Sequence, residues 1–376
     1  MKIRAAVLHE MGSIEPYAKS KPITIETLEL SEPKTNEVLI KIGAAGLCHS
    51  DLSVINGSRP RPMPMVLGHE AAGEVIQLGP DVTDFEKGDH VVCTFIPSCG
   101  HCIPCKEGRP ALCENGATSN EKGEMLTGGF RLLSEDNRTM YHHLGISGFA
   151  EYAVVSTNSI VKVDKDIPFE KVAIFGCAVI TGIGAVINTA NISAGSTVAV
   201  VGLGGIGLNT ILGARLAGAS EIIALDINED KFELAKSLGA TAVFNSGDDK
   251  VVENVKTYAS GGVNYAFETA GVVPAMEVAY QITKRGGMTT TTGLPDPKHN
   301  FSFPQVTLAA EERTVKGSYV GSCVPERDIP RFVNLYKQSR LPVDQLLTDT
   351  LSLEEINEGF DRLARGEAAR LVVKIT

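Results

Sequence analysis

The sequence lacks three features that mark membrane, secreted and nucleic-acid-binding proteins. No run approaches the roughly 18 consecutive apolar residues of a membrane-spanning helix. The first residues, MKIRAAVLHEMG, contain no apolar core of signal-peptide length. Lys and Arg (35) do not outnumber Asp and Glu (45), and the net charge of −10 argues against a broad basic face for nucleic acid. We therefore expect a cytoplasmic protein that binds neither nucleic acid nor membrane.

Length and pattern predict two different domains. The 376 residues favour two domains over one, at about 150 residues per domain. The first part contains short strands at regular spacing, among them IRAAVL, ITIETLEL, EVLIKIGAAG, AAGEVIQL and HVVCTF, and predicts a small barrel or sandwich. From Ser196 strands alternate regularly with helices, which predicts about six strands of one doubly wound sheet. The tail reads as two helices and a final strand, RLVVKIT.

Four of the eight cysteines lie close together in the pattern C-x2-C-x2-C-x7-C. They are Cys99, Cys102, Cys105 and Cys113. Without a secretion signal, closely spaced cysteines are more often metal ligands than disulfides. Four thiolates can close a tetrahedral zinc site that has no open position, which is a structural site. A disulfide pair and an iron–sulfur cluster are the alternatives, although runs of the latter kind usually end in Cys-Pro.

A second candidate metal site lies between Ala44 and Gly73. Cys48 and His69 are of the ligand types that zinc prefers, and Asp51 and Glu70 stand close to them in the sequence. A site with three protein ligands keeps one position open for substrate. Cys177, between small neighbours, is the candidate third ligand. The alternative is that Cys48 and His69 are an ordinary buried thiol and a core histidine.

A glycine turn in the second domain predicts a dinucleotide site. The pattern G-x-G-x-x-G, from Gly202 to Gly207, follows an apolar strand and opens an apolar helix, and the next strand ends in Asp226. A carboxylate there accepts hydrogen bonds from ribose hydroxyls and repels a 2′-phosphate, which favours NAD over NADP. Lys231 could reach either a ribose hydroxyl or a phosphate. A Rossmann fold that binds no nucleotide is the alternative.

Residues 114–148 are polar and rich in glycine. A loop of this length usually covers a site or makes contacts. The pair His142-His143 stands near its end, and we expect solvated or pocket-lining side chains there rather than metal ligands.

Together these residues resemble the zinc-dependent alcohol dehydrogenases of the medium-chain dehydrogenase/reductase superfamily, over essentially the whole chain. The segments that carry the resemblance are Cys48-His49-Ser50-Asp51, Gly68-His69-Glu70, the four-cysteine lobe, Cys177 and Gly202–Gly207. The resemblance implies an α/β fold with a GroES-like catalytic domain (residues 1–178 and 320–376). This domain would carry a structural-zinc lobe at about residues 95–115. A Rossmann coenzyme domain (179–319) would be inserted in it.

The resemblance also implies a role for each site residue and two zinc ions per chain. Cys48, His69 and Cys177 would bind the catalytic zinc and the four clustered cysteines the structural one. Glu70 would lie behind the catalytic zinc, Asp51 would fix the His69 ring, and Ser50 would take the alcohol proton. The residues expected at NAD(H) are His49, Thr181, Gly202, Gly204, Gly205, Ile206, Gly207, Asp226, Lys231 and Arg370. Those expected to line the substrate pocket are Phe95, His143, Leu144, Leu294 and Tyr319.

The sequence departs from the family pattern at two places, which affect the expected proton relay and the expected subfamily. Ser53 stands where the animal enzymes have the His that ends the proton relay. The acidic residues and the Arg typical of glutathione-dependent formaldehyde dehydrogenases are replaced by Asn56–Arg61 and Glu114–Ala117, which disfavours that subfamily.

We expect a primary aliphatic or aromatic alcohol as substrate. A polyol or secondary alcohol is the enzymatic alternative, and a non-catalytic NAD-binding protein is the alternative of another class. Family members form dimers or tetramers, often by pairing of edge strands, and the strand near 314–320 could do this here. We expect Cys93 and Cys323 to be core thiols.

Overall fold

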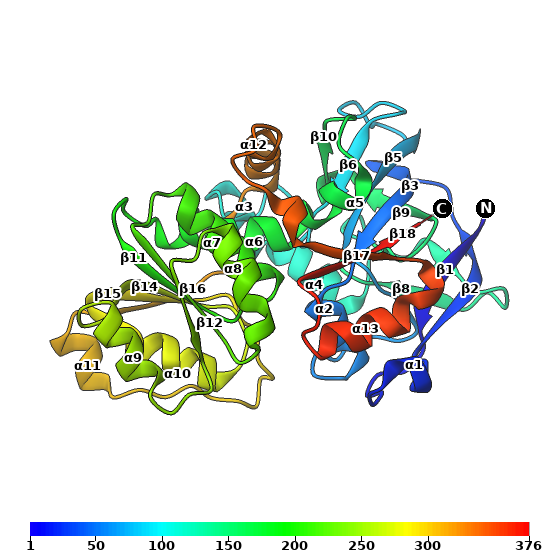
Figure 1. The fold of residues 1–376 in the computed structure, drawn as a ribbon. Coiled ribbons are helices and arrows are strands. Elements are labelled where there is room, and N and C mark those ends of the chain that lie inside the picture. Colours follow the sequence, from blue (N-terminus) through cyan, green and yellow to red (C-terminus); the bar gives the residue numbers. More distant parts are fainter. Residues whose placement is uncertain (376) are drawn as a thin grey trace. The chain divides into compact units, whose positions relative to one another are not determined.

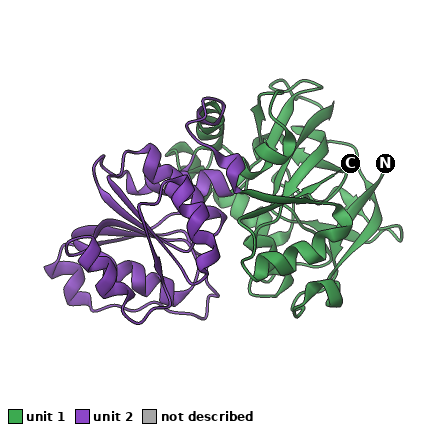
Figure 2. Ribbon diagram, viewed as in Figure 1, with its two compact units in different colours: residues 1–177, 324–334, 347–376 green, residues 178–323, 335–346 purple. Residues whose placement is uncertain are grey.

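The structure, a computed structural model, describes residues 1–375, which form two compact units (Figure 2). Unit 1 comprises residues 1–177, 324–334 and 347 onward, and unit 2 comprises 178–323 and 335–346. The expected boundaries, 178/179 and 319/320, lie within a few residues of those observed. Residues 335–346 were expected in the catalytic domain but belong to unit 2, where η7 (Val343–Leu346) contacts helix α7 (Gly205–Leu216).

Unit 1 contains a closed barrel and a larger sheet. Within the described residues the barrel has the order β1-β2-β7-β8-β4, and the seven-stranded sheet has the order β10-β6-β5-β3-β18-β17, with β9 also paired to β3. The strands are β1 (Lys2–Leu8), β2 (Ile23–Leu30), β3 (Glu37–Gly46), β4 (Met65–Val66), β5 (Glu70–Leu78), β6 (His90–Cys93), β7 (Leu132–Leu133), β8 (Thr139–His142), β9 (Tyr152–Ser156), β10 (Ile160–Val163), β17 (Leu347–Leu351) and β18 (Arg370–Lys374). The helices are α1 (Tyr17–Ser20), α2 (His49–Ile55), α3 (Ile103–Lys106), η1 (Pro110–Leu112), α4 (Glu114–Lys122), η2 (Thr157–Ser159), α5 (Phe169–Val172), η3 (Ala173–Gly176), η8 (Leu353–Glu355) and α13 (Ile356–Ala364).

Unit 2 is a parallel sheet with helices on both faces. Among the described residues its strands follow the order β13-β12-β11-β14-β15-β16, the doubly wound order in which the chain reverses beside the first strand. Helices α7 and α8 cover one face, and α9 and α10 cover the other (Figure 1). The predicted fold class is therefore confirmed for both domains. The strands are β11 (Thr197–Val201), β12 (Glu221–Asp226), β13 (Ala242–Asn245), β14 (Val263–Glu268), β15 (Thr283–Thr291) and β16 (Thr314–Gly317). The remaining helices are α6 (Ala178–Gly184), the π-helix η4 (Ala185–Ala190), η5 (Glu229–Lys231), α8 (Phe232–Leu238), α9 (Val251–Tyr258), α10 (Val273–Ile282), α11 (Gln305–Ala310) and η6 (Val320–Ser322), while α12 (Pro325–Lys337) begins in unit 1 and ends in unit 2.

Residues 114–148 are not the long loop that their composition suggested. They contain helix α4 and strands β7 and β8. The sequence of α4, ENGATSNEK, has no apolar periodicity, so pattern alone could not reveal it. Its first turn is capped by a thiol, because Cys113 Sγ accepts a hydrogen bond from the Gly116 N–H.

No single helix within residues 1–375 has both the length and the apolar composition of a membrane span. The bent pair Phe169–Gly176 and Ala178–Ala190 meets both criteria only when the two are taken together.

A buried ion pair ties the 123–143 segment to strand β3. Glu37 and Arg131 are 0% and 3% exposed. Arg131 Nε donates to Glu37 Oε2 at 2.8 Å, and its Nη2 donates to the other carboxylate oxygen. Burial raises the pKa of Glu37, but the hydrogen bonds from Arg131 and Thr127 outweigh burial and lower it overall. The Arg131 N–H also donates to His142 Nε2 at 3.1 Å, so this pair fixes the backbone that leads into His143.

Replacing Glu37 by Gln should lower the free energy of unfolding by about 3 kcal/mol, because it leaves a buried guanidinium without its counter-charge. Urea unfolding followed by circular dichroism measures this. The matched control is Glu135→Gln, which removes the exposed Lys2–Glu135 pair and should cost less than about 1 kcal/mol. Equal losses in the two variants would contradict the structural role of the buried pair.

Candidate active site

Strand pairing brings the candidate ligands of the first metal site together. Strands β3 and β5 are antiparallel, with Gly46 opposite Glu70. Cys48 follows β3 as the N-cap residue of α2, and His69 immediately precedes β5. A Cβ at position 46 would lie 2.6 Å from Glu70 Oε2, so glycine makes room for this carboxylate.

Cys177, which follows η3, completes the cluster. One ligand atom from each of Cys48, His69, Glu70 and Cys177 lies within 4.8 Å of those of the other three. All four residues are buried, with exposed fractions between 0% and 6%. The structure thus brings together the three ligands predicted from the sequence, and all three belong to unit 1.

Asp51 holds the His69 ring. Asp51 Oδ1 lies 3.3 Å from His69 Nδ1 and accepts the Gly68 N–H at 3.0 Å. Burial raises the pKa of Asp51, but the two histidines beside it, His69 and His143, more than offset this and lower it. A carboxylate can only accept hydrogen bonds, so Nδ1 carries the proton and Nε2 is the nitrogen left to bind a metal.

The buried polar atoms of this site fit a cation. His69 Nε2 and both Glu70 carboxylate oxygens are buried without a hydrogen-bond partner, and an unpaired buried polar atom is costly. Burial lowers the pKa of His69, yet Asp51 and Cys48 together raise it well above its usual value. The site therefore stabilises positive charge at this point, and thiol and imidazole ligands favour zinc among divalent metals.

Arg370 lies behind this cluster. Its Nη2 is 3.2 Å from Glu70 Oε1, and its Nη1 donates to the Leu47 carbonyl at 3.2 Å. Burial raises the pKa of Glu70 to about 8, although Arg370 acts in the opposite direction. The guanidinium is 4% exposed and is engaged with the metal-site carboxylate. Its predicted contact with a pyrophosphate stays a prediction.

The four-cysteine lobe forms a second cluster in unit 1. One Sγ atom from each of its members, Cys99, Cys102, Cys105 and Cys113, lies within 4.8 Å of the other three. Backbone N–H groups point at the sulfurs, since Cys99 N lies 3.2 Å from Cys113 Sγ and Cys102 N lies 3.4 Å from Cys99 Sγ. Burial opposes ionisation of Cys99, but amide hydrogen bonds outweigh it and lower the pKa to about 6. Four sulfurs with amide donors fit a zinc site that has no open position.

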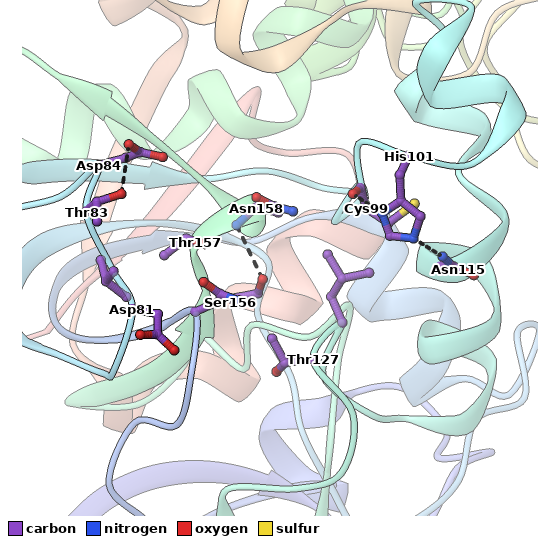
Figure 3. A pocket seen from close by; sticks show the side chains of 13 residues that line it. Asp81, Thr83, Asp84, Cys99, His101, Asn115, Thr127, Ser156, Thr157 and Asn158 are labelled. Carbon is purple, nitrogen blue, oxygen red and sulfur yellow. Dashed lines mark hydrogen bonds between the residues drawn. The ribbon is translucent and has the colours of Figure 1, made fainter.

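His101 is not needed as a ligand in this lobe. Its Nδ1 donates to the Cys99 carbonyl at 2.7 Å, and Asn115 Nδ2 lies 3.3 Å from Nε2. This ring lines a pocket of about 400 Å³ together with Cys99 and Asn115. Figure 3 shows these side chains next to one another. The pocket also contains Asp81 and Asp84 and includes neither His69 nor its neighbours.

In unit 2 three glycines of the predicted dinucleotide turn differ in what a side chain at their position would meet. Gly202 has φ +101°, in the left-handed region that side chains disfavour. A Cβ on Gly207 would lie 1.8 Å from the Gly202 carbonyl oxygen. A Cβ on Gly204 would meet nothing within 4 Å, so that face is open to a ligand. Thr269, which the sequence analysis missed, donates to the Gly202 carbonyl at 2.6 Å and holds the turn.

Asp226 lies beside the same turn at the end of β12. Its carboxylate accepts the Leu203 N–H at 2.6 Å and the Asn228 N–H at 2.9 Å. Lys231 Nζ lies 3.2 Å from both of its oxygens, so the predicted neighbour pairs with the carboxylate itself. Gly205 and Ile206 are in the first turn of α7, and Thr181 is in α6, which packs against α7.

Two of the predicted pocket residues contact His69 in unit 1, and a third follows one of them in the chain. Phe95 and His143 have ring centroids 4.9 and 5.3 Å from that of His69, both with edge-on geometry. Leu144 follows His143 and is 2% exposed. The other two, Leu294 and Tyr319, belong to unit 2.

Ser50 is half-buried in the first turn of α2, while His49 beside it is exposed. Ser53 donates its hydroxyl to the His49 carbonyl at 2.8 Å.

The two cysteines without a predicted ligand role are buried. Burial raises the pKa of Cys93 to about 12, which keeps it a thiol. Cys323 is 1% exposed, and its Sγ lies 3.3 Å from the Ile180 carbonyl oxygen. Both have the environment expected of core thiols.

Replacing Cys177 by Ala should remove one of two bound zinc ions per chain, and replacing Cys102 by Ala should remove the other, because each variant breaks one cluster. Elemental analysis after dialysis measures this. Cys93→Ala, which deletes a buried thiol outside both clusters, should keep both ions. A full metal complement in Cys177→Ala would rule that residue out as a ligand.

Gly207→Ala should lower both thermal stability and dinucleotide affinity, because its methyl group meets the Gly202 carbonyl. Gly204→Ala should weaken dinucleotide binding with little change in melting temperature, since its methyl group points into open space. Fluorescence titration with NADH and thermal unfolding separate the two effects. Unchanged affinity in both variants would place the dinucleotide elsewhere.

Comparison with known proteins agrees with this geometry. Residues 34–165 match the alcohol dehydrogenase GroES-like domain, and residues 205–338 match the zinc-binding dehydrogenase domain. The chain is 41% identical to an alcohol dehydrogenase class-3 of Drosophila melanogaster, over 95% of this chain and 96% of that protein.

Solved structures of similar proteins cover the whole chain. Benzyl alcohol dehydrogenase from Acinetobacter calcoaceticus is 35% identical with a TM-score of 0.93, covering 100% of both chains. A zinc-binding dehydrogenase from Sinorhizobium meliloti, solved with NADP bound, is 26% identical with a TM-score of 0.82, covering 100% of this chain and 99% of that one. Zinc is therefore consistent with the matched family and with the two clusters described above. A nicotinamide cofactor is consistent with the NADP-bound structure. The chain belongs to the zinc-dependent alcohol dehydrogenases of the medium-chain dehydrogenase/reductase superfamily.

Proposed function

We propose that this alcohol dehydrogenase oxidises a primary aliphatic or aromatic alcohol to the aldehyde, reversibly, with NAD⁺ as cofactor. The observation that carries the proposal is the buried cluster of Cys48, His69 and Cys177, with the Phe95 ring packed against His69. Three ligands of this kind leave one position of a tetrahedral zinc for a substrate oxygen. The apolar Phe95 ring next to this cluster favours an alcohol with a hydrocarbon substituent. A benzyl alcohol dehydrogenase is among the similar proteins.

Each residue of the site has a separate role in the proposed reaction. Cys48, His69 and Cys177 would hold the catalytic zinc, and the four clustered cysteines the structural one. Zinc supplies a Lewis acid that lowers the pKa of an alcohol, and the nicotinamide accepts hydride. Asp51 orients His69 through Nδ1, and Ser50 Oγ takes the alcohol proton. The near-complete burial of the ligands excludes bulk water from the reacting centre.

Ser53 cannot extend this proton path directly in the arrangement observed. Its hydroxyl hydrogen is directed to the His49 carbonyl oxygen at 2.8 Å. With this hydrogen directed to a carbonyl, which takes up no proton, Ser53 does not replace the relay histidine of the animal enzymes.

The carboxylate of Asp226 supports NAD⁺ over NADP⁺, because it sits where the adenosine ribose binds in a doubly wound fold. Backbone N–H groups fix its orientation, and Lys231 only partly offsets its charge. A 2′-phosphate would meet a buried negative charge there. We extend the proposal to His49 and Arg370 at the pyrophosphate, and to Thr181 and Ile206 against the nicotinamide.

A polyol or secondary alcohol is the second candidate substrate. It is favoured by His143, a polar ring that packs against His69 beside the apolar Phe95. A polyol could hydrogen-bond to this imidazole, whereas a benzyl group could not.

The assembly that we propose is a cytoplasmic homodimer or homotetramer, with no nucleic-acid or membrane partner. Six of the eight cysteines belong to the two candidate metal clusters, and cysteines used as metal ligands are typical of a reducing compartment. Strand β16 lies at the end of the unit 2 sheet order, and its residues are largely exposed. Such an edge offers unpaired backbone groups to a second copy.

A substrate scan tests the reaction. Benzyl alcohol and unbranched primary alcohols should give kcat/KM at least about tenfold above sorbitol and 2-propanol, because the apolar Phe95 ring packs against His69. Tenfold corresponds to about 1.4 kcal/mol. Initial rates of NADH formation measure this. Formaldehyde with glutathione should give no advantage over formaldehyde alone. A preference for sorbitol would replace the primary alcohol by the second candidate.

Asp226→Ser should reduce the preference for NAD⁺ over NADP⁺ by about 1–2 kcal/mol, or roughly tenfold, because it removes the charge that opposes a 2′-phosphate. The ratio of kcat/KM values for the two cofactors measures this. Asp230→Ser removes an exposed carboxylate four residues further along the chain, in η5, and should leave the ratio unchanged. A wild-type preference for NADP⁺ would overturn the cofactor assignment.

A further inference from the structure

One carboxylate oxygen of Asp51 lies within hydrogen-bonding reach of two histidines. Its Oδ1 lies 2.9 Å from His143 Nδ1 and 3.3 Å from His69 Nδ1, and it also accepts the Gly68 N–H at 3.0 Å. Its Oδ2 is buried and has no hydrogen-bond partner. Asp51 and His69 are 0% exposed and His143 is 3% exposed, so water is excluded from this array.

The shorter of the two contacts is the one to His143. A carboxylate that is fully buried has only the partners that the fold supplies, and its torsion angle decides which oxygen faces which donor. If His143 did not hold Oδ1, the hydrogen bonds described for residues 1–375 would leave the Gly68 amide and His69 to oppose rotation of the carboxylate. The His69 contact is already long at 3.3 Å, so small rotations would break it.

Two further observations point to a role beyond filling space. The His143 ring packs edge-on against His69, with interplanar angle 82°, so it fixes the ligand ring from a second direction. The backbone leading into His143 is anchored by the Arg131–His142 hydrogen bond described above. The donor at position 143 therefore comes from the residue that directly follows strand β8.

We propose that His143 is a positioning residue for the catalytic metal ligand: by hydrogen-bonding to Asp51 Oδ1 it locks the carboxylate that orients His69, and so it tightens zinc binding at the site of Cys48, His69 and Cys177. The inference rests on the proposed catalytic zinc. It assigns to His143 a function in metal retention that is separate from its place in the substrate pocket.

The test is the zinc affinity of His143→Phe, which keeps an aromatic ring and removes the donor. Competition with a chelator of known affinity should show about tenfold weaker binding of one zinc per chain, because loss of a supporting hydrogen bond to a metal ligand typically costs 10–100-fold. The four-cysteine site serves as an internal reference and should keep its affinity. Cobalt substitution should also shift the visible absorption bands of the weakened site alone.

Three variants separate positioning from mere packing. His143→Asn places an amide N–H near the position of Nδ1 and should restore most of the affinity. Cys93→Ala, which shortens a buried side chain outside both metal clusters, is the packing control and should leave the affinity of the catalytic site unchanged. In an Asp51→Asn background, His143→Phe should add no further loss, because the partner through which it acts is already altered.

These measurements can contradict the positioning role of His143 without contradicting the proposed function. Equal affinity in wild type and His143→Phe, or losses that multiply in the double variant, would overturn the positioning role alone. A wild-type protein that binds only one zinc per chain would overturn the proposed function together with this inference. Should His143→Phe not fold, His143→Met, which also lacks the donor, takes its place and carries the same expectation.

Discussion

The antiparallel pairing of β3 with β5 is the constraint on which the catalytic unit depends. It sets Gly46 opposite Glu70, and the residues just beyond each strand end, Cys48 and His69, therefore face the same point. Because side chains alternate along a strand, a slip of one residue in this register would send the ligands to opposite faces of the sheet. The register is held by a core on both sides of β3, whose residues are almost all buried.

Burial of polar atoms around that point is tolerated because a cation completes it. Within residues 1–375, His69 Nε2 and the Glu70 oxygens have no hydrogen-bond partner, and Arg370 compensates Glu70 as an ion pair. A buried group of this kind destabilises the fold unless its partner is present. Binding the metal and stabilising the fold are thus one event in this unit, as they are in the four-cysteine lobe.

Much of this architecture could be predicted from the sequence, because periodicity and glycine pattern report directly on strands and on the dinucleotide turn. Gly202–Gly207 and β3 are examples in which local pattern and tertiary structure agree. Helix α4 could not be predicted, since a cysteine cap and metal-lobe packing replace the apolar stripe that marks most helices. The Asp51–His143 contact joins residues 92 apart, and no local signal encodes such a pairing.

The place of β18 in the sheet has a consequence for how the enzyme is made. This strand, Arg370–Lys374, lies between β3 and β17 and brings Arg370 against Glu70. During synthesis the strands of unit 2 leave the ribosome before β18 does, so that its sheet can form while unit 1 still has an open edge on β3. The carboxylate behind the catalytic zinc therefore acquires its counter-charge only at the end of translation, and chains truncated before residue 370 carry an unfinished metal site.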